Sequence, residues 1–98
     1  MSEEVEVVAI IQAKPGHEGA LEAAGKACIT PTRAEAGCIS YVLTTDPTKA
    51  GKLVFIETWQ SKAALDAHMQ TPHLQAFVAA VEENADGGID LNVLKKIA

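Results

Sequence analysis

The stretch "KLVFIETWQSKAALDAHMQTPHLQAF", residues 52–77, decides the fold because it runs from a strand into a helix across one short turn. Along residues 52–59, Leu53 and Phe55 share one face with the polar Glu57, as expected for a strand with period-two alternation. Ser61 is a favoured N-cap residue. We therefore expect a strand over residues 52–59 followed at once by a helix over residues 62–70.

A Thr-Pro step divides the helical segment after residue 70. Thr71 is a second N-cap candidate, and Pro72 stands at the first helical position, where its missing N–H would have had no partner. The second helix is expected to reach about Ala85, before the "DGG" turn. Its apolar stripe consists of Leu74, Phe77, Val78 and Val81.

The N-terminal half supplies another strand and a long helical segment. Residues 5–13 are apolar on one face throughout and on the other at its centre, so this strand is expected to be covered on both sides. An alanine-rich helix begins at about His17. Pro31 is expected to kink or break that helix near Ile29, and Gly37 to end its last turn.

Two further strands complete an α+β fold. Residues 38–46 are expected to pair with residues 52–59 as an antiparallel hairpin, and residues 89–98 to form the last strand, with Leu91, Val93 and Ile97 on one face. The order is β-α-β-β-α-β, the ferredoxin-like split arrangement, in one domain over residues 1–98. Helices on a single face leave the other face bare and apolar, so we predict a homodimer packed sheet on sheet.

Composition excludes several classes of protein. The net charge is −5, from 8 basic and 13 acidic residues, which argues against nucleic acid as a partner. No apolar run approaches the ~20 residues of a membrane span, and acidic residues precede the first apolar run where a secretory signal would be basic. Cys28 and Cys38 are expected to be reduced, small apolar groups. A cytoplasmic protein is the simplest interpretation.

Several short motifs, in order along the chain, resemble the antibiotic biosynthesis monooxygenase (ABM) family. They lie between about residues 5 and 94, and the ordered set is more specific than any one piece. The residues that carry the resemblance are Lys14-Pro15-Gly16, Thr32-Arg33-Ala34-Glu35-Ala36-Gly37-Cys38, Tyr41, Glu57-Thr58-Trp59, Ala64-Leu65, His68, Thr71-Pro72-His73 and Phe77.

The resemblance implies a dimeric α+β barrel and several possible reactions. Members of the family include monooxygenases that convert phenols or hydroquinones to quinones without a cofactor, isomerases of small phosphorylated sugars, and haem-degrading enzymes. Haem degradation is disfavoured here, because "VVAIIQA" on the first strand lacks the asparagine of those relatives. We expect a cofactor-free monooxygenase that oxidises a phenolic or hydroquinone-like small molecule with O₂. The alternatives are an isomerase of a small carbonyl or phosphorylated sugar compound and a non-catalytic binding domain.

The same resemblance suggests which residues form the site. His68 is expected to be the catalytic acid–base group, since the pKa of histidine lies near neutrality. Trp59 and Phe77 are expected to wall an aromatic pocket. The alternative for each of these three side chains is that it only packs in the core. The remaining substrate-binding candidates are His73, Tyr41 and Arg33, while Glu35 is interpreted as a helix-end charge and Glu57 as the partner of a cation or hydroxyl.

A metal shared by His68 and His73 is not expected. Ligands on one face of a continuous helix lie three or four residues apart, whereas these histidines are five apart across a proline. Catalytic zinc also needs three protein ligands as a rule, and the sequence shows no third beside them.

Overall fold

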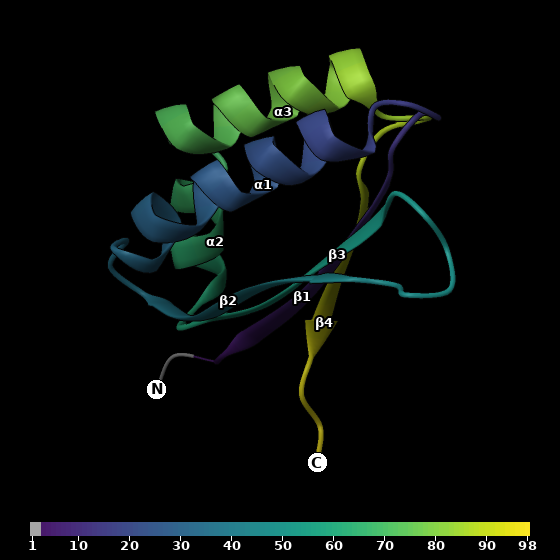
Figure 1. Cartoon of the computed structure of the whole chain (residues 1–98). Helices are drawn as coiled ribbons and strands as arrows, with labels where there is room; N and C mark the ends of the chain where they lie inside the picture. The colour runs from purple at the N-terminus through teal and green to yellow at the C-terminus, as the bar shows by residue number, and fades with distance from the viewer. Residues whose placement is uncertain (1–2) are drawn as a thin grey trace.

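Four antiparallel strands form one sheet in the order β2-β3-β1-β4, and the helices cover one of its faces, as the computed structural model shows for residues 3–98 (Figure 1). This arrangement confirms the ferredoxin-like α+β prediction. The elements are β1 (Val5–Gln12), α1 (Glu18–Arg33), β2 (Cys38–Thr45), β3 (Lys52–Trp59), α2 (Lys62–His68), α3 (Pro72–Asn84) and β4 (Asp90–Lys95).

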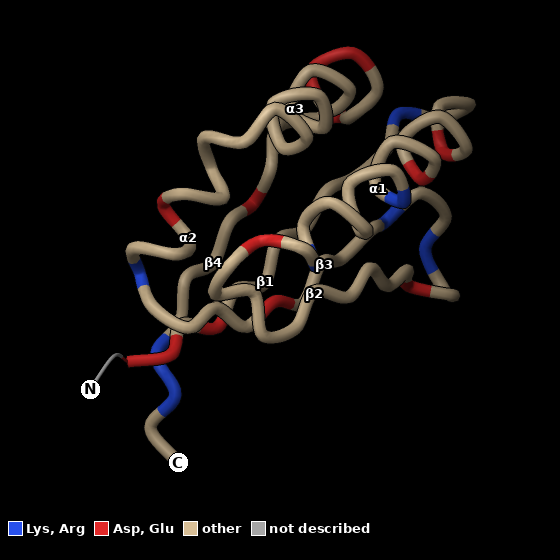
Figure 2. The backbone as a smooth tube through the Cα atoms, turned by 90° about the vertical axis from the view of Figure 1, so that its left-hand side faces the viewer, with Lys and Arg blue, Asp and Glu red and all other residues tan. Residues whose placement is uncertain are grey.

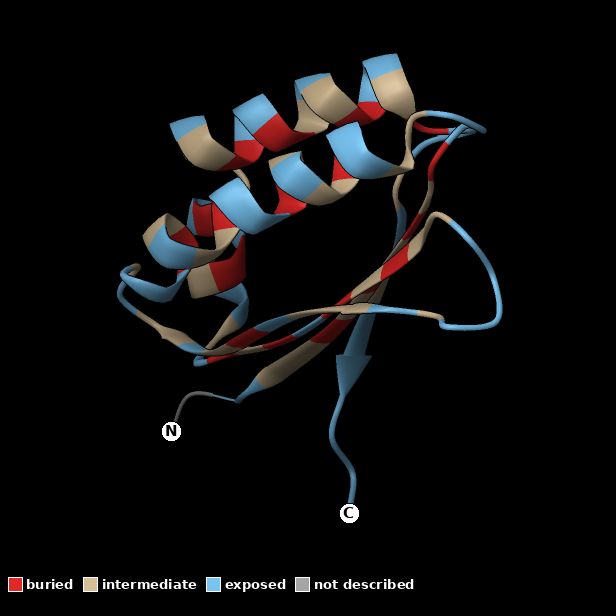
Figure 3. Cartoon of the chain, in the orientation of Figure 1, coloured by how far each residue is buried: buried red, intermediate tan, exposed pale blue. Residues whose placement is uncertain are grey.

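The core lies between the sheet and the helices. In the register of β1 and β3, Val7 pairs with Glu57 and Ala9 with Phe55, so these side chains share the face beneath the helices. Along both central strands, buried positions on this face alternate with less buried positions on the opposite face (Figure 3). Glu57 is therefore a carboxyl group on a core-facing row that is otherwise apolar.

Helix α1 differs from the sequence prediction at its C-terminal end. It continues without a break through Pro31 to Arg33; the proline lies in the last turn, and only two helical residues follow it. Gly37 does not end the helix, whose C-cap is Ala34. Gly37 instead has a φ of +89° in the following turn, and a Cβ there would lie 2.7 Å from the Cβ of Ala64.

Both predicted N-caps are confirmed by their hydrogen bonds. The Ser61 hydroxyl accepts from the Ala64 N–H at 3.1 Å, and the Thr71 hydroxyl accepts from the Leu74 N–H at 3.3 Å. The Thr71 hydroxyl also donates to the His68 carbonyl at 2.8 Å. Helix α2 ends at His68, two residues earlier than expected, so this histidine occupies the final turn before the Thr-Pro step.

The strand β4 forms an edge that the helices cover only in part. Leu91 pairs with Ala9 and Val93 with Val7, which places both on the helix side of the sheet, yet each is more than two-fifths exposed. Ile97 was expected on the same face, but β4 ends at Lys95 and Ile97 is 92% exposed. Lys95 and Glu3 form an ion pair of 3.4 Å, which places the segment before β1 beside the end of β4 (Figure 2).

The face of the sheet opposite the helices is apolar and open. Val42 pairs with Ile56 on this face, and Leu94 of β4 lies on it as well; all three are at least 41% exposed. Lys and Arg are scattered along the chain rather than gathered on one surface (Figure 2). None of the helices in residues 3–98 is long and apolar enough to cross a membrane.

Candidate active site

A small cavity of about 160 Å³ lies on the helix side of the sheet, next to α2 and α3. Most of its lining is aliphatic or methionine side chains from β1, α2, α3, the segment after α3 and β4. Three polar side chains also line it: Tyr41, Glu57 and His68. An apolar hollow with a few convergent polar groups is the usual form of a small-molecule site.

His68 is held in one tautomer by Glu35. Its side chain is 2% exposed, and its Nδ1 atom lies 2.7 Å from the Glu35 Oε2 atom. An ionised carboxylate only accepts hydrogen bonds, so Nδ1 carries the proton and Nε2 is the nitrogen left for a ligand. Burial lowers the pKa of His68, an effect that the Glu35 carboxylate opposes. A neutral imidazole with a free Nε2 is a proton acceptor.

Glu35 also binds His73, through the same oxygen atom. His73 Nε2 lies 2.7 Å from Glu35 Oε2, so two imidazoles converge on one carboxylate. The break at Thr71-Pro72 places His68 at the end of α2 and His73 at the start of α3. Glu35, in the turn after α1, thus ties together α2 and α3 and is more than a helix-end charge.

These three residues are also the group in residues 3–98 that could hold a metal ion. Their donor atoms all lie within 4.8 Å of one another. Both imidazole nitrogens stand at hydrogen-bond distance from a single oxygen, and each can donate its N–H to that oxygen. The geometry is that of a hydrogen-bonded cluster.

Glu57 is the second titratable group of the cavity. It is 5% exposed, and its Oε1 atom accepts from the indole N–H of Trp59 at 2.8 Å. Burial raises its pKa from 4.5 to about 7, against the opposing effect of the Trp59 hydrogen bond and with a smaller contribution from Glu35. The prediction that a cation or a hydroxyl group pairs with Glu57 is therefore wrong, because its hydrogen-bond partner is the indole N–H of Trp59.

Tyr41 completes the polar lining from β2. It is 3% exposed, and burial raises the pKa of its phenol, which keeps the hydroxyl protonated. Its hydroxyl lies 3.8 Å from Cys28 Sγ. Cys28 is buried and Cys38 half-buried, and both are free thiols in residues 3–98. Burial raises the pKa of Cys38, which keeps this thiol protonated.

Two other sequence-predicted residues lie behind the cavity rather than in its lining. Trp59 is completely buried, and its ring centroid is 4.6 Å from that of His68. It therefore supports both His68 and Glu57. Phe77 is a core residue that packs edge-on against Phe55 at 5.2 Å. His73 lines a different hollow, which it shares with residues of α1 and α3.

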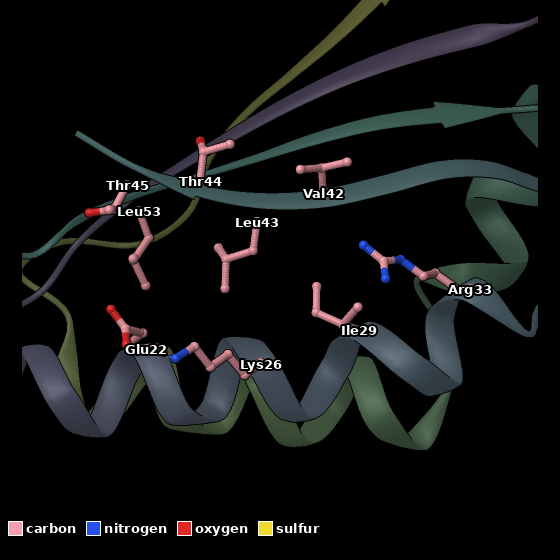
Figure 4. Close-up of a pocket in the computed structure, with 9 residues that line it drawn as sticks. All are labelled: Glu22, Lys26, Ile29, Arg33, Val42, Leu43, Thr44, Thr45 and Leu53. Atoms are coloured by element: carbon pink, nitrogen blue, oxygen red, sulfur yellow. Dashed lines mark ion pairs between the residues drawn. The ribbon is translucent and has the colours of Figure 1, made fainter. Parts of the chain in front are cut away.

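Arg33 lies in a separate open groove between α1 and β2. The groove has a volume of about 320 Å³. Figure 4 shows Glu22 and Lys26 of α1 on one side of it and Leu43 and Leu53 pointing toward them from the sheet. The Arg33 Nε–H donates to the Tyr41 carbonyl at 3.0 Å, which fastens the end of α1 to the sheet. Arg33 is thus outside the lining of the cavity that contains His68.

Comparison with known proteins gives a consistent result. The family model described as "Antibiotic biosynthesis monooxygenase" matches residues 5–80. Rv0793 of Mycobacterium tuberculosis is 39% identical over 94 residues, covering 96% of this chain and 92% of that protein. Its solved structure superposes with a TM-score of 0.91, at 38% identity, over 97% of this chain and 96% of that one.

Two further relatives differ in how much of them the chain covers. The "Probable quinol monooxygenase YgiN" of Escherichia coli is 37% identical in an alignment of 89 positions, which covers 78% of this chain and 83% of that protein. The protein sll1783 of Synechocystis sp. is 41% identical over 68 residues, or 69% of this chain. The chain covers 46% of the length of sll1783.

Proposed function

Because this chain belongs to the antibiotic biosynthesis monooxygenase family, we propose that it oxidises a phenol or hydroquinone with O₂ and without a bound cofactor. One observation carries the proposal: a buried histidine, locked by Glu35 in the tautomer that accepts protons at Nε2, lines an apolar cavity. The name of the E. coli relative as a quinol monooxygenase supports the substrate class.

The chemistry that this site favours begins with loss of the phenolic proton. His68 Nε2 takes the proton from the substrate O–H, and the Glu35 carboxylate stabilises the imidazolium that results. The phenolate is electron-rich enough to reduce O₂ directly, so the protein has only to hold it, ionise it and keep water away. The aliphatic lining of the cavity keeps water away.

The overall reaction balances without any further reagent. A phenol with a free para carbon reacts with one O₂ to give a quinone and one water. One oxygen atom becomes the new carbonyl of the quinone, and the other leaves as water with the two hydrogens that the substrate has lost. The phenol supplies all four electrons for the reduction of O₂, two toward the new carbon–oxygen bond and two toward water.

The volume of the cavity favours a substrate with one aromatic ring. A protein cavity of about 150 Å³ is large enough to bind benzene, and the cavity here has about 160 Å³. We expect kcat/KM for single-ring phenols and hydroquinones to exceed that for their naphthalene counterparts.

The open face of the sheet supports a homodimer. Val42, Ile56 and Leu94 form an apolar surface opposite the helices, and large exposed apolar patches mark interaction sites. A second copy of the chain offers an identical surface, so a two-fold pair packed sheet on sheet would bury both.

An oxygen electrode tests the proposed function. The wild-type chain is expected to consume O₂ with some member of a panel of phenols and hydroquinones, and His68→Ala to reduce the rate about 10²-fold or more. His17→Ala is the control, since His17 lies by Asn84, outside the cavity. No uptake by the wild type, or uptake that His68→Ala leaves unchanged, would show the proposal to be wrong. Turnover of a small carbonyl compound under strict anaerobiosis would assign an isomerase instead.

A further inference from the structure

We propose that Glu57 is a second catalytic acid–base residue of this cavity, and that it removes the ring-carbon hydrogen in the step that forms the quinone. The inference rests on the proposed function and adds a group to it. His68 and Glu57 line one cavity from different layers, His68 from the last turn of α2 and Glu57 from the central strand β3.

The surroundings of Glu57 offer its carboxyl group no cation. A buried carboxylate normally pairs with a cation, because desolvation penalises an isolated charge. Within residues 3–98, no lysine, arginine or histidine forms an ion pair with Glu57. Its one side-chain hydrogen bond, from Trp59, engages Oε1. The Oε2 atom is left for a molecule in the cavity.

The reaction needs a second base at a later step. After His68 has taken the phenolic proton, the phenolate and O₂ combine into a peroxide at the para carbon, and the imidazolium returns its proton to the distal oxygen. The ring carbon must then lose its hydrogen. Glu57 takes that proton while the C–H electrons form the new C=O bond, the O–O bond breaks, and hydroxide leaves. The hydroxide takes the proton from Glu57 and becomes water, so both residues are restored.

The groups that face Glu57 leave it able to serve at neutral pH. His68 lies across the cavity, Glu35 lies in the turn after α1, Cys38 and Tyr41 lie on β2, and β1 presents only Val7 opposite it. With the pKa of Glu57 at about 7, the protonated and ionised forms are both populated there. That is the range in which a general acid–base group is most effective.

Glu57→Gln is the decisive variant, because glutamine keeps an oxygen acceptor for Trp59 and loses only the basic group. With a single-ring phenol, we expect kcat to fall about 10²-fold or more, with a smaller effect on KM. Glu82→Gln, on the exposed side of α3, is the matched control and should keep the wild-type rate.

Ring-deuterated phenol separates this role from a structural one. If Glu57 removes the ring hydrogen, deuterium at the para carbon should slow Glu57→Gln more than it slows the wild type, because the C–H step has become limiting. Equal isotope effects, or a Glu57→Gln rate within twofold of wild type, would overturn the inference and leave the proposed function standing. Failure of the wild type to consume O₂ with any phenol would overturn both.

Discussion

The indole N–H of Trp59 donates to Glu57, two residues earlier on the same face of β3, across 2.8 Å. Trp59 is completely buried and is outside the lining of the cavity. The tryptophan therefore influences the site through two neighbours: it orients the Glu57 carboxyl, and its ring lies 4.6 Å from the ring of His68.

Trp59→Phe should shift the pH profile of the reaction upward. Phenylalanine keeps an aromatic ring beside His68 but removes the hydrogen bond that lowers the pKa of Glu57. Without that bond, the pKa should rise further above about 7, so activity that needs ionised Glu57 should require a higher pH. The measurement is kcat/KM from pH 5 to 9 for both proteins. An acidic limb that does not move would show that the bond is only structural.

Glu35→Gln should reduce activity about 10²-fold while leaving the cavity intact. The carboxylate raises the pKa of His68 against the effect of burial, so an uncharged amide should make this histidine a weaker base. The amide N–H₂ group can also turn toward Nδ1 and favour the wrong tautomer. Steady-state kinetics with Glu22→Gln as the surface control tests this, and equal rates for the two variants would contradict it.

The sequence predicts the fold well because the signals for it are local. Ser61 and Thr71 cap helices through atoms three residues away, and the alternation of Leu53, Phe55 and Glu57 defines the face of β3. The prediction that Pro31 breaks α1 is wrong, because only two helical residues follow the proline and α1 reaches Arg33 without a break.

The site was harder to predict because its contacts join distant parts of the chain. Glu35 precedes His68 by 33 residues and His73 by 38, and no pattern in the sequence pairs them. The sequence did contain one indication of the site: Glu57 places a carboxyl group on the same strand face as Leu53 and Phe55. A charged residue at a position that packing reserves for apolar groups is a candidate for function.

Glu57 should make the protein less stable as the pH rises. Its pKa is about 7 in the folded state and 4.5 ordinarily, so between these values the folded state binds more protons than the unfolded one. Stability is therefore lost as the pH rises through this window, by up to about 3 kcal/mol. Glu57→Gln should thus gain stability relative to wild type between pH 4 and pH 8.

Urea unfolding of both proteins at pH 4 and at pH 8, at one protein concentration, measures the difference in their free energies of unfolding. The comparison between variant and wild type cancels the contribution of His68, whose lowered pKa acts in the opposite direction. A difference between Glu57→Gln and wild type that is the same at pH 4 and pH 8 would mean that folding does not shift the pKa of Glu57.

Removal of metal ions should leave the activity unchanged. The two histidine nitrogens already share Glu35 Oε2 at 2.7 Å, so each has a hydrogen-bond partner without an ion. Elemental analysis of the purified protein and O₂ uptake after dialysis against a chelator test this. One equivalent of zinc, iron or manganese per chain, with activity lost on dialysis and regained on adding that metal back, would refute it.

Ile56→Asp should convert a dimer to a monomer. Ile56 lies at the centre of the open sheet face, opposite Val42, and is 47% exposed in the single chain. A charge on each copy at this position would be desolvated in a sheet-on-sheet interface, and two like charges would repel each other there. Light scattering should give about twice the 10.3 kDa chain mass for wild type and the chain mass itself for the variant.

Thr48→Asp, in the loop between β2 and β3, is the matched control and should remain a dimer. A wild-type monomer at micromolar concentration would leave the apolar face without this explanation, because a stable pair should not dissociate there.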